Sequence, residues 1–247
     1  MQEETLVLKQ QSQFIPVQFG TRYIIEELTS ENFDEFTDLV AEEYHLNDPL
    51  SIVLGATSTG YREAMESLKG IMLSQNQGFI ARCTNSGMVV GGLTGEDYQA
   101  VYDFKKDQAL ETYYGRLNEG KQILYDRGVL KKEWKISLMT MGITRSTHYQ
   151  QYIMTVLTYN VMLKAKHLGF EYAVAEVNHI GTYKIFSKDS HKILISVDFH
   201  DKYEEIKNNL SQEEKDFIQQ SGLSDYIFFM KLDSAIVKRQ EYLKSKQ

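Results

Sequence analysis

The stretch WKISLMTMGI (134–143) is followed, after a short turn, by YQQYIMTVLTYNVMLKAKHLG (149–169). The first segment is a mainly apolar run of strand length. The second carries apolar residues such as Ile153 and Leu157 at intervals of three and four, which is the spacing of one helix face. Gly169 closes it, as expected of a residue just past a helix C-terminus. A strand that leads into the longest predicted helix therefore organises the second half of the sequence.

The first half also alternates strand and helix patterns. Residues 23–28 have a strand pattern, and a helix is predicted after a cap at Thr29 or Ser30, where apolar residues begin to recur at helical spacing. Pro49 ends this helix because proline disfavours helical geometry in the residue before it. A second amphipathic helix follows, and then two strands around a hairpin turn at 85–87.

Residues 96–132 are polar and rich in tyrosine, and their spacing predicts an inserted pair of helices that pack together. The patterns after the long helix are strand, short helix, strand, polar helix and strand, at 172–177, 181–187, 193–199, 211–220 and 226–232. This order predicts an α+β fold, with a mixed, twisted sheet and helices on both faces. We expect one domain at 21–233, an N-terminal extension at 1–20 and a charged C-terminal tail at 234–247.

Composition and charge exclude several classes of protein. The chain has 247 residues, of which 42% are hydrophobic and 25% charged, as in ordinary globular proteins. Its formal net charge of −7 argues against nonspecific nucleic-acid binding, since neutralising phosphates requires an excess of Lys and Arg. No apolar stretch is long enough to span a membrane. Cys83 is the only cysteine and the histidines show no metal-ligand spacing, so we expect a soluble protein without a metal, in the reducing cytoplasm.

Several motifs follow one another in a recognisable order. The segment EYHLNDPL (43–50) is similar to an aromatic-x-x-acid-Glu-Pro-Leu motif after a first helix, and a long polar insertion precedes the central strand. That strand, at 136–143, leads into the long helix, and Asn178 precedes the pair Ile185-Phe186. In order and spacing these features resemble the GNAT acetyltransferase superfamily, and more narrowly the insect-type arylalkylamine and dopamine N-acetyltransferases.

The resemblance implies acetyl transfer from acetyl-CoA to a small amine, an arylalkylamine in the narrower group. The amine must lose a proton before it attacks the thioester carbonyl, so a base or a base–water chain is needed. The family's Glu before Pro-Leu corresponds here to Asp48, a shorter base that could act through a water; alternatively, Asp48 only ends a helix beside proline. Main-chain groups of Met139, Met141 and Ile143 would hold the carbonyl oxygen and the pantetheine arm. Alternatively, these residues only form a buried strand and bind no donor.

The phosphate-binding turn departs from the family pattern. In the family, Arg or Gln, two residues, Gly, one residue, and then Gly or Ala open the long helix, which leaves bare amides for the pyrophosphate. Tyr149, Tyr152 and Met154 stand at those positions here, and a shift by one residue does not restore the glycine. Bulky Tyr152 argues against ordinary coenzyme A binding. The residues of this turn that would still meet the donor are Arg145, Gln150, Gln151, Tyr152 and Ile153.

The family also often uses a tyrosine of the short helix as the general acid for the departing thiolate. Phe186 stands at that position and has no proton to donate. Thr182 and Tyr183 carry hydroxyl groups nearby and are the candidate replacements, with packing or capping as their alternative roles.

Two functions from different classes remain. The first is an N-acetyltransferase whose partner is a small amine substrate, which the sequence Asp48-Pro49-Leu50 favours. The second is a catalytically inactive GNAT-like domain that acts as a binding module or as a subunit with protein partners, which Tyr152 and Phe186 favour.

Overall fold

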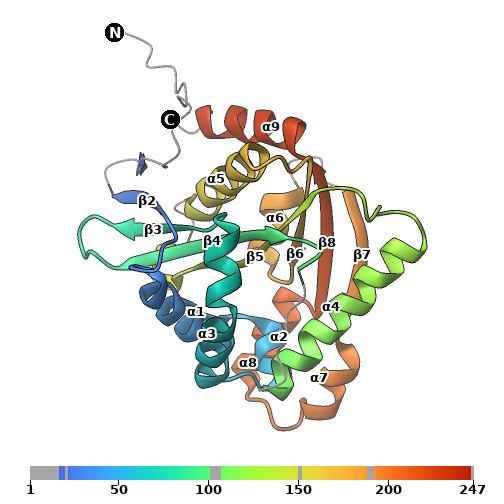
Figure 1. Cartoon of the computed structure of the whole chain (residues 1–247). Coiled ribbons are helices and arrows are strands. Elements are labelled where there is room, and N and C mark those ends of the chain that lie inside the picture. The colour runs from blue at the N-terminus through green and yellow to red at the C-terminus, as the bar shows by residue number, and fades with distance from the viewer. Residues whose placement is uncertain (1–16, 20–21, 101–106, 150–151, 188–191, 246–247) are drawn as a thin grey trace, which may run out of the picture.

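The computed structural model describes residues 17–19, 22–100, 107–149, 152–187 and 192–245. Within these ranges eight strands form one sheet in the order β1-β2-β3-β4-β5-β6-β8-β7, with helices on both faces (Figure 1). The strands are β1 (Val17–Phe19), β2 (Tyr23–Glu27), β3 (Phe79–Cys83), β4 (Val89–Asp97), β5 (Ile136–Thr144), β6 (Tyr172–Val177), β7 (Lys192–Asp198) and β8 (Ser224–Lys231). The α-helices are α1 (Phe33–Asn47), α2 (Pro49–Leu54), α3 (Ser58–Gln75), α4 (Gln108–Asp126), α5 (Ile153–His167), α6 (Ile180–Ser187), α7 (His200–Ile206), α8 (Gln212–Ser221) and α9 (Leu232–Lys244).

The sheet is mixed, as the sequence predicts. Neighbouring strands pair antiparallel except β5 and β6, which run parallel and are joined through α5. Two parallel strands need such a crossover, because the chain must return to the end of the sheet where the first strand began before the second strand can start. The predicted strand and long helix of the second half are therefore β5 and α5, and they lie at the centre of the fold.

Helices α1 and α5 press on opposite faces of β4, and glycines make the close approach possible. A Cβ atom added to Gly92 would overlap the ring of Phe36 on α1. One added to Gly91 would lie 2.6 Å from the Ile153 side chain on α5. Larger residues at these two positions would push both helices away from the central strands.

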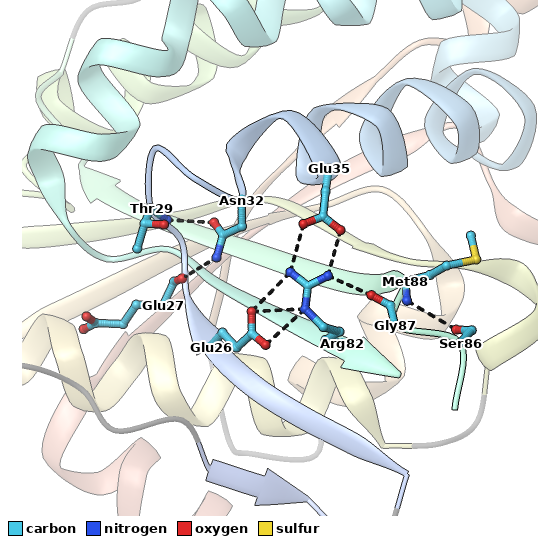
Figure 2. A network of polar contacts seen from close by, with 9 residues as sticks. All are labelled: Glu26, Glu27, Thr29, Asn32, Glu35, Arg82, Ser86, Gly87 and Met88. Atoms are coloured by element: carbon cyan, nitrogen blue, oxygen red, sulfur yellow. Dashed lines mark hydrogen bonds and ion pairs between the residues drawn. The ribbon is translucent and has the colours of Figure 1, made fainter. Parts of the chain in front are cut away.

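A fully paired charge network holds α1 to the edge of the sheet (Figure 2). Arg82 on β3 donates to Glu26 on β2, with Nε 3.1 Å from Oε1, and to Glu35 on α1, with Nη1 2.7 Å from Oε2. The same guanidinium donates to the Gly87 carbonyl of the hairpin turn at 2.8 Å. One side chain therefore connects two strands, the turn and a helix.

Two segments differ from the sequence expectation. The segment 234–247, expected as a charged tail, contributes most of α9, which lies beside α5 (Figure 1). It is helical because its few apolar residues share one face, where Leu232 and Ala235 are buried. The insertion at 96–132 contains a single helix, α4, within its described residues, and begins with the last two residues of β4. Buried Glu96 extends that strand because it pairs with Leu138 of β5.

The boundaries around the long helix also shift. Residues 146–148 form a separate 3-10 turn, and α5 begins at Ile153, so it has 15 residues against 19 in α4. A short helix that the sequence does not predict, α2, starts directly at Pro49. Proline is well tolerated there because the first helical residue needs no intrahelical N–H bond.

Candidate functional site

The central strand β5 separates from its parallel neighbour halfway along its length. Pairing between β5 and β6 ends at Met139 and Ala175, while β6 continues beside β8 as far as Val177. The pairing of β5 with β4 shifts register in the same region, and Met141 has a left-handed backbone with φ of 48°. This bulge bends β5 away from β6. A gap therefore opens between two strands of a continuous sheet.

A cavity of about 570 Å³ occupies this gap. It is bounded by the end of α1 and the start of α2, by α4, by the bulged part of β5, by the start of α5 and by α6. The predicted site residues that line it are Asp48, Met139, Met141, Ile143, Tyr152, Ile153 and Thr182. Arg145 and Tyr183 lie outside its lining, and Gln150 and Gln151 fall outside the described residues.

Asp48 lies between α1 and α2 and is 6% exposed. Its Oδ2 accepts hydrogen bonds from the amide and the hydroxyl of Ser51 at 2.7 and 2.5 Å, which caps α2. Its Oδ1 has no hydrogen-bond partner among the described residues. Burial raises the pKa of Asp48 to about 6, and the hydrogen bonds from Ser51 limit that rise. The residue therefore caps a helix with one oxygen, while its other oxygen is buried without a partner among the described residues.

Two tyrosines connect Asp48 to the bulged strand. The Tyr61 hydroxyl lies 2.5 Å from the Ser51 hydroxyl; since Ser51 donates its one proton to Asp48, Tyr61 donates to Ser51. The ring of Tyr44 stacks on that of Tyr61 with centroids 5.3 Å apart, and its hydroxyl donates to the Gly142 carbonyl at 3.1 Å. The position of Asp48 is thus fixed relative to β5.

The start of α5 forms another wall. Tyr152 precedes the helix with φ of 57°, a left-handed conformation that normally favours glycine. Its ring is 42% exposed and lies against Tyr242 of α9, with centroids 6.3 Å apart. The next three residues, 153–155, line the cavity, and their N–H groups are among those that a helix leaves without intrahelical partners.

Arg145 does not point to this helix start. Its Nη1 lies 2.9 Å from Glu42 and 3.7 Å from Glu43, both on α1. The Glu43 carboxylate also accepts from the Ser146 amide at 3.0 Å. The cation expected to meet the phosphates is therefore already paired inside the protein, because α1 presents two carboxylates beside the turn.

The two hydroxyl candidates on α6 have different surroundings. Thr182 lines the cavity. Tyr183 packs edge-on against Tyr226 and Phe228 of β8, with centroids 4.9 and 5.4 Å apart. Phe186 lies next to Phe228 in the core and also borders the cavity. Successive residues of a helix point in different directions, so Thr182 is the hydroxyl that the fold brings to the site and Tyr183 is not.

Sequence reasoning missed three neighbouring carboxyl groups beside the cavity, two of which are fully buried. Glu176 on β6 lines it, Asp225 on β8 is 0% exposed, and so is Glu96 on β4. The Tyr113 hydroxyl and the Val177 amide donate to Asp225 at 2.6 and 2.8 Å. The signal in the sequence is an acidic residue within an apolar strand, as in the segment YAVAEV at 172–177.

The described residues contain no helix with the length and hydropathy needed to cross a bilayer. They also contain no group of three His, Cys, Asp or Glu side chains placed to hold a metal ion.

Comparisons with known proteins find similarity of structure. No protein-family model matches the sequence, and no curated protein matches it either. The C-terminal condensation domain of Ebony, solved with beta-alanyl-dopamine, has a TM-score of 0.68 and 13% identity, over 85% of this chain and 98% of that one. Arylalkylamine N-acetyltransferase 2 from Aedes aegypti has a TM-score of 0.62 and 13% identity, over 85% and 99%. The Drosophila melanogaster polyamine N-acetyltransferase has a TM-score of 0.60 and 8% identity, over 85% and 99%.

These similarities confirm the fold that the sequence motifs indicate. The chain has the fold of the GNAT acetyltransferases, and its structural neighbours are mainly insect arylalkylamine N-acetyltransferases. Identities of 8 to 13% establish the fold alone.

Proposed function

We propose that the protein transfers an acetyl group from acetyl-CoA to a small amine, in a reaction that takes place in the cavity between β5 and β6. The observation that carries the proposal is the unpartnered Oδ1 of Asp48 in the wall of a cavity of about 570 Å³, beside a strand that has separated from its neighbour. A structural helix cap needs only one of its carboxylate oxygens; here the second is buried without a partner, at a cost that a bound ligand would offset.

Asp48 acts as the general base. A buried carboxylate with a pKa of about 6 is ionised at neutral pH and still accepts a proton readily. It takes a proton from the amine nitrogen, directly or through one water, as that nitrogen bonds to the acyl carbon. The carbon–sulfur bond breaks, and the leaving thiolate takes a proton to become a thiol. Thr182, the α6 hydroxyl that lines the cavity, is the candidate group that relays this proton from water, giving up its own proton as it receives another.

The described residues fit the thioester end of acetyl-CoA, which supplies the activated acyl group. Met139 is the last residue of β5 that pairs with β6, and Met141 and Ile143 lie beyond it, where this edge of β5 has no neighbouring strand. Main-chain groups of these residues can therefore bind an extended amide-containing arm. The N–H groups at the start of α5, which lack partners within the helix, suit the phosphates. Tyr152 narrows the approach to them, and Arg145 adds no free cation because Glu42 already pairs with it.

The substrate class follows from the walls of the cavity. Aromatic rings of Tyr44, Tyr61, Tyr113, Tyr114 and Tyr149 surround the acidic groups. Rings stack on aromatic groups and attract cations through their faces, so a small amine that reaches Asp48 finds favourable contacts. An arylalkylamine is one such amine.

The second candidate is a noncatalytic binding module that keeps the cavity without the donor. The specific observation in its favour is the phosphate turn, where Tyr152 occupies a left-handed position in place of glycine and Arg145 is paired with α1. In that case the cavity would bind an amine and release it unchanged.

The two candidates are separated by measuring free thiol released from acetyl-CoA in the presence of an amine panel that includes tryptamine and dopamine. We expect turnover in the wild type and a loss of at least about 100-fold in Asp48→Asn. Asp126→Asn is the matched control, since Asp126 is exposed on α4, and it should keep full activity. An absence of thiol release, together with amine binding measured by calorimetry, would establish the binding module instead.

A further inference from the structure

Glu176 is a partly buried residue of the cavity wall, and the proposed reaction does not use its carboxyl group. It lies near the end of β6, between buried Ala175 and Val177. It borders both the main cavity and a small space of about 20 Å³ behind it, which Tyr114 and Met141 also line. No hydrogen bond or ion pair to its carboxyl group is formed within the described part of the chain. The side chain is therefore placed at the site without a structural partner.

Acidic groups outnumber basic groups around Glu176. Asp225 and Glu96 face it from β8 and β4, and the Lys121 ammonium of α4 is the cation beside it. Lys121 donates to the Tyr98 carbonyl and lies over the Tyr98 ring, 4.5 Å from its centroid. Glu176 thus has two carboxyl groups and one ammonium group as neighbours, and that ammonium group is itself bound elsewhere.

Burial shifts the pKa values of these groups toward their neutral forms. Burial raises the pKa of Glu96 to about 8, and burial together with the neighbouring Asp225 raises the pKa of Glu176 above its usual range. Burial lowers the pKa of Lys121. Glu96 Oε2 has no partner among the described residues and lines the small space that Glu176 shares. An added cation would stabilise the ionised form of this cluster, because it would reduce the repulsion between its members.

The second carboxyl group of the cavity comes from a different element. Asp48 lies at the junction of α1 and α2, whereas Glu176 belongs to β6, and both line the same cavity. Asp48 is proposed to take the proton of the reacting nitrogen, so it does not account for Glu176. A monoamine would pair with one of the two carboxyl groups and leave the other without a partner.

We propose that Glu176 binds a second ammonium group of the acceptor, so that the preferred substrates are short diamines acetylated at the nitrogen nearer Asp48. This inference rests on the proposed function for its reaction, but its binding part stands by itself. Tyr113 and Tyr114 on α4 line the same cavity and provide ring faces for the methylene chain and for the cation. Carboxyl groups recognise an ammonium group through charge, which a neutral alkyl end does not supply.

The first test compares 1,4-diaminobutane with butylamine as acceptors, in the wild type, in Glu176→Gln and in Glu171→Gln. The two amines differ only in the second amino group, and Glu171 is an exposed residue just before β6. We expect kcat/KM to favour the diamine by at least about tenfold in the wild type and in Glu171→Gln, and Glu176→Gln to remove that preference while changing butylamine by less than about threefold. Equal values for the two amines in the wild type, or an unchanged preference in Glu176→Gln, would overturn the proposal.

The second test measures binding without acetyl-CoA, so that it does not depend on turnover. Calorimetry with 1,4-diaminobutane in two buffers of different ionisation enthalpy reports both affinity and proton release. A bound cation lowers the pKa of Glu176, so the complex holds fewer protons and the affinity rises as the pH increases toward that pKa. The groups that titrate or carry charge around Glu176 are Glu96, Tyr98, Tyr113, Tyr114, Lys121 and Asp225.

The two tests distinguish the two proposals. In one outcome the wild type binds the diamine with proton release, Glu176→Gln does not, and neither protein transfers an acetyl group. This outcome would support the role of Glu176 and contradict the proposed reaction. Equal acetyl transfer to butylamine and to the diamine, with the same diamine affinity in the wild type and in Glu176→Gln, would support the proposed reaction and contradict the proposed role of Glu176.

Discussion

Arg82 and Glu176 show two opposite ways in which this fold places charge. Around Arg82, one guanidinium meets the carboxylates of Glu26 and Glu35, so every group in the network has a partner (Figure 2). Glu176 instead faces two further carboxyl groups, those of Asp225 and Glu96, and has the single ammonium of Lys121 beside it. The first arrangement stabilises the edge of the sheet, whereas the second costs stability and lies beside a cavity. This difference separates a structural network from the cluster that we propose as part of a ligand site.

The largest effect on stability is expected from breaking the paired network. Arg82→Met removes the cation and leaves Glu26 and Glu35 to repel each other, so we expect a loss of about 2 kcal/mol in the free energy of unfolding. Urea denaturation of the two proteins at neutral pH measures it. The exposed pair Lys202–Glu205 provides a control, since Lys202→Met should cost less than about 0.5 kcal/mol. Equal losses in the two variants would contradict the structural role of Arg82.

A change of opposite sign is expected when the unpaired cluster is neutralised. Because the pKa of Glu96 is raised to about 8, the folded protein holds a proton there that the unfolded chain releases above its ordinary pKa. Stability should therefore fall as the pH rises from about 5 to about 8, and Glu96→Gln should flatten this fall by about 1 kcal/mol. Thermal unfolding across this range tests it. A melting temperature that rises with pH in the wild type would contradict the sign.

A smaller change is expected at the start of α5. Tyr152→Gly places glycine at a left-handed position, so we expect a gain of about 0.5–1 kcal/mol in stability. The same change uncovers the helix N–H groups, and coenzyme A should bind at least about fivefold more tightly by calorimetry. Weaker binding in this variant would mean that the Tyr152 ring supports the donor rather than obstructs it.

The smallest effect is expected at Tyr183. Its ring packs on Phe228 and its side chain lies outside the cavity lining, so Tyr183→Phe should leave kcat unchanged within about twofold. Thr182→Val, one residue earlier, should lower kcat by about tenfold or more. Thiol release measures both, and the reverse order of effects would assign the proton donor to Tyr183.

Much of the fold was predictable from local patterns. The strand at 134–143 and the helix that follows it became β5 and α5, and the hairpin turn at 85–87 joins β3 and β4. Hydrophobic periodicity carries these assignments because it reports which side of an element is buried. The tail at 234–247 was not recognised as part of α9, since a helix with only a few buried residues is dominated by its charged face.

The candidate site was predictable only in part. Asp48, Thr182 and the β5 residues line one cavity, as their motif positions suggest. The pairing of Arg145 with α1 and the packing of Tyr183 against β8 depend on tertiary contacts that no local pattern encodes. Glu176 could not be predicted as a site residue for the same reason. A single acidic residue in a strand indicates a site only once the fold shows that Asp225 and Glu96 lie beside it.

The central claim, that Asp48 is the base of an acetyl transfer in this cavity, is tested most directly by the pH dependence of kcat/KM. The account predicts that the wild-type rate rises with pH through a pKa of about 6, because Asp48 must be ionised to accept the proton of the amine. Asp48→Asn should lose both the rate and this limb of the profile. A profile that keeps the same limb in Asp48→Asn would contradict the account.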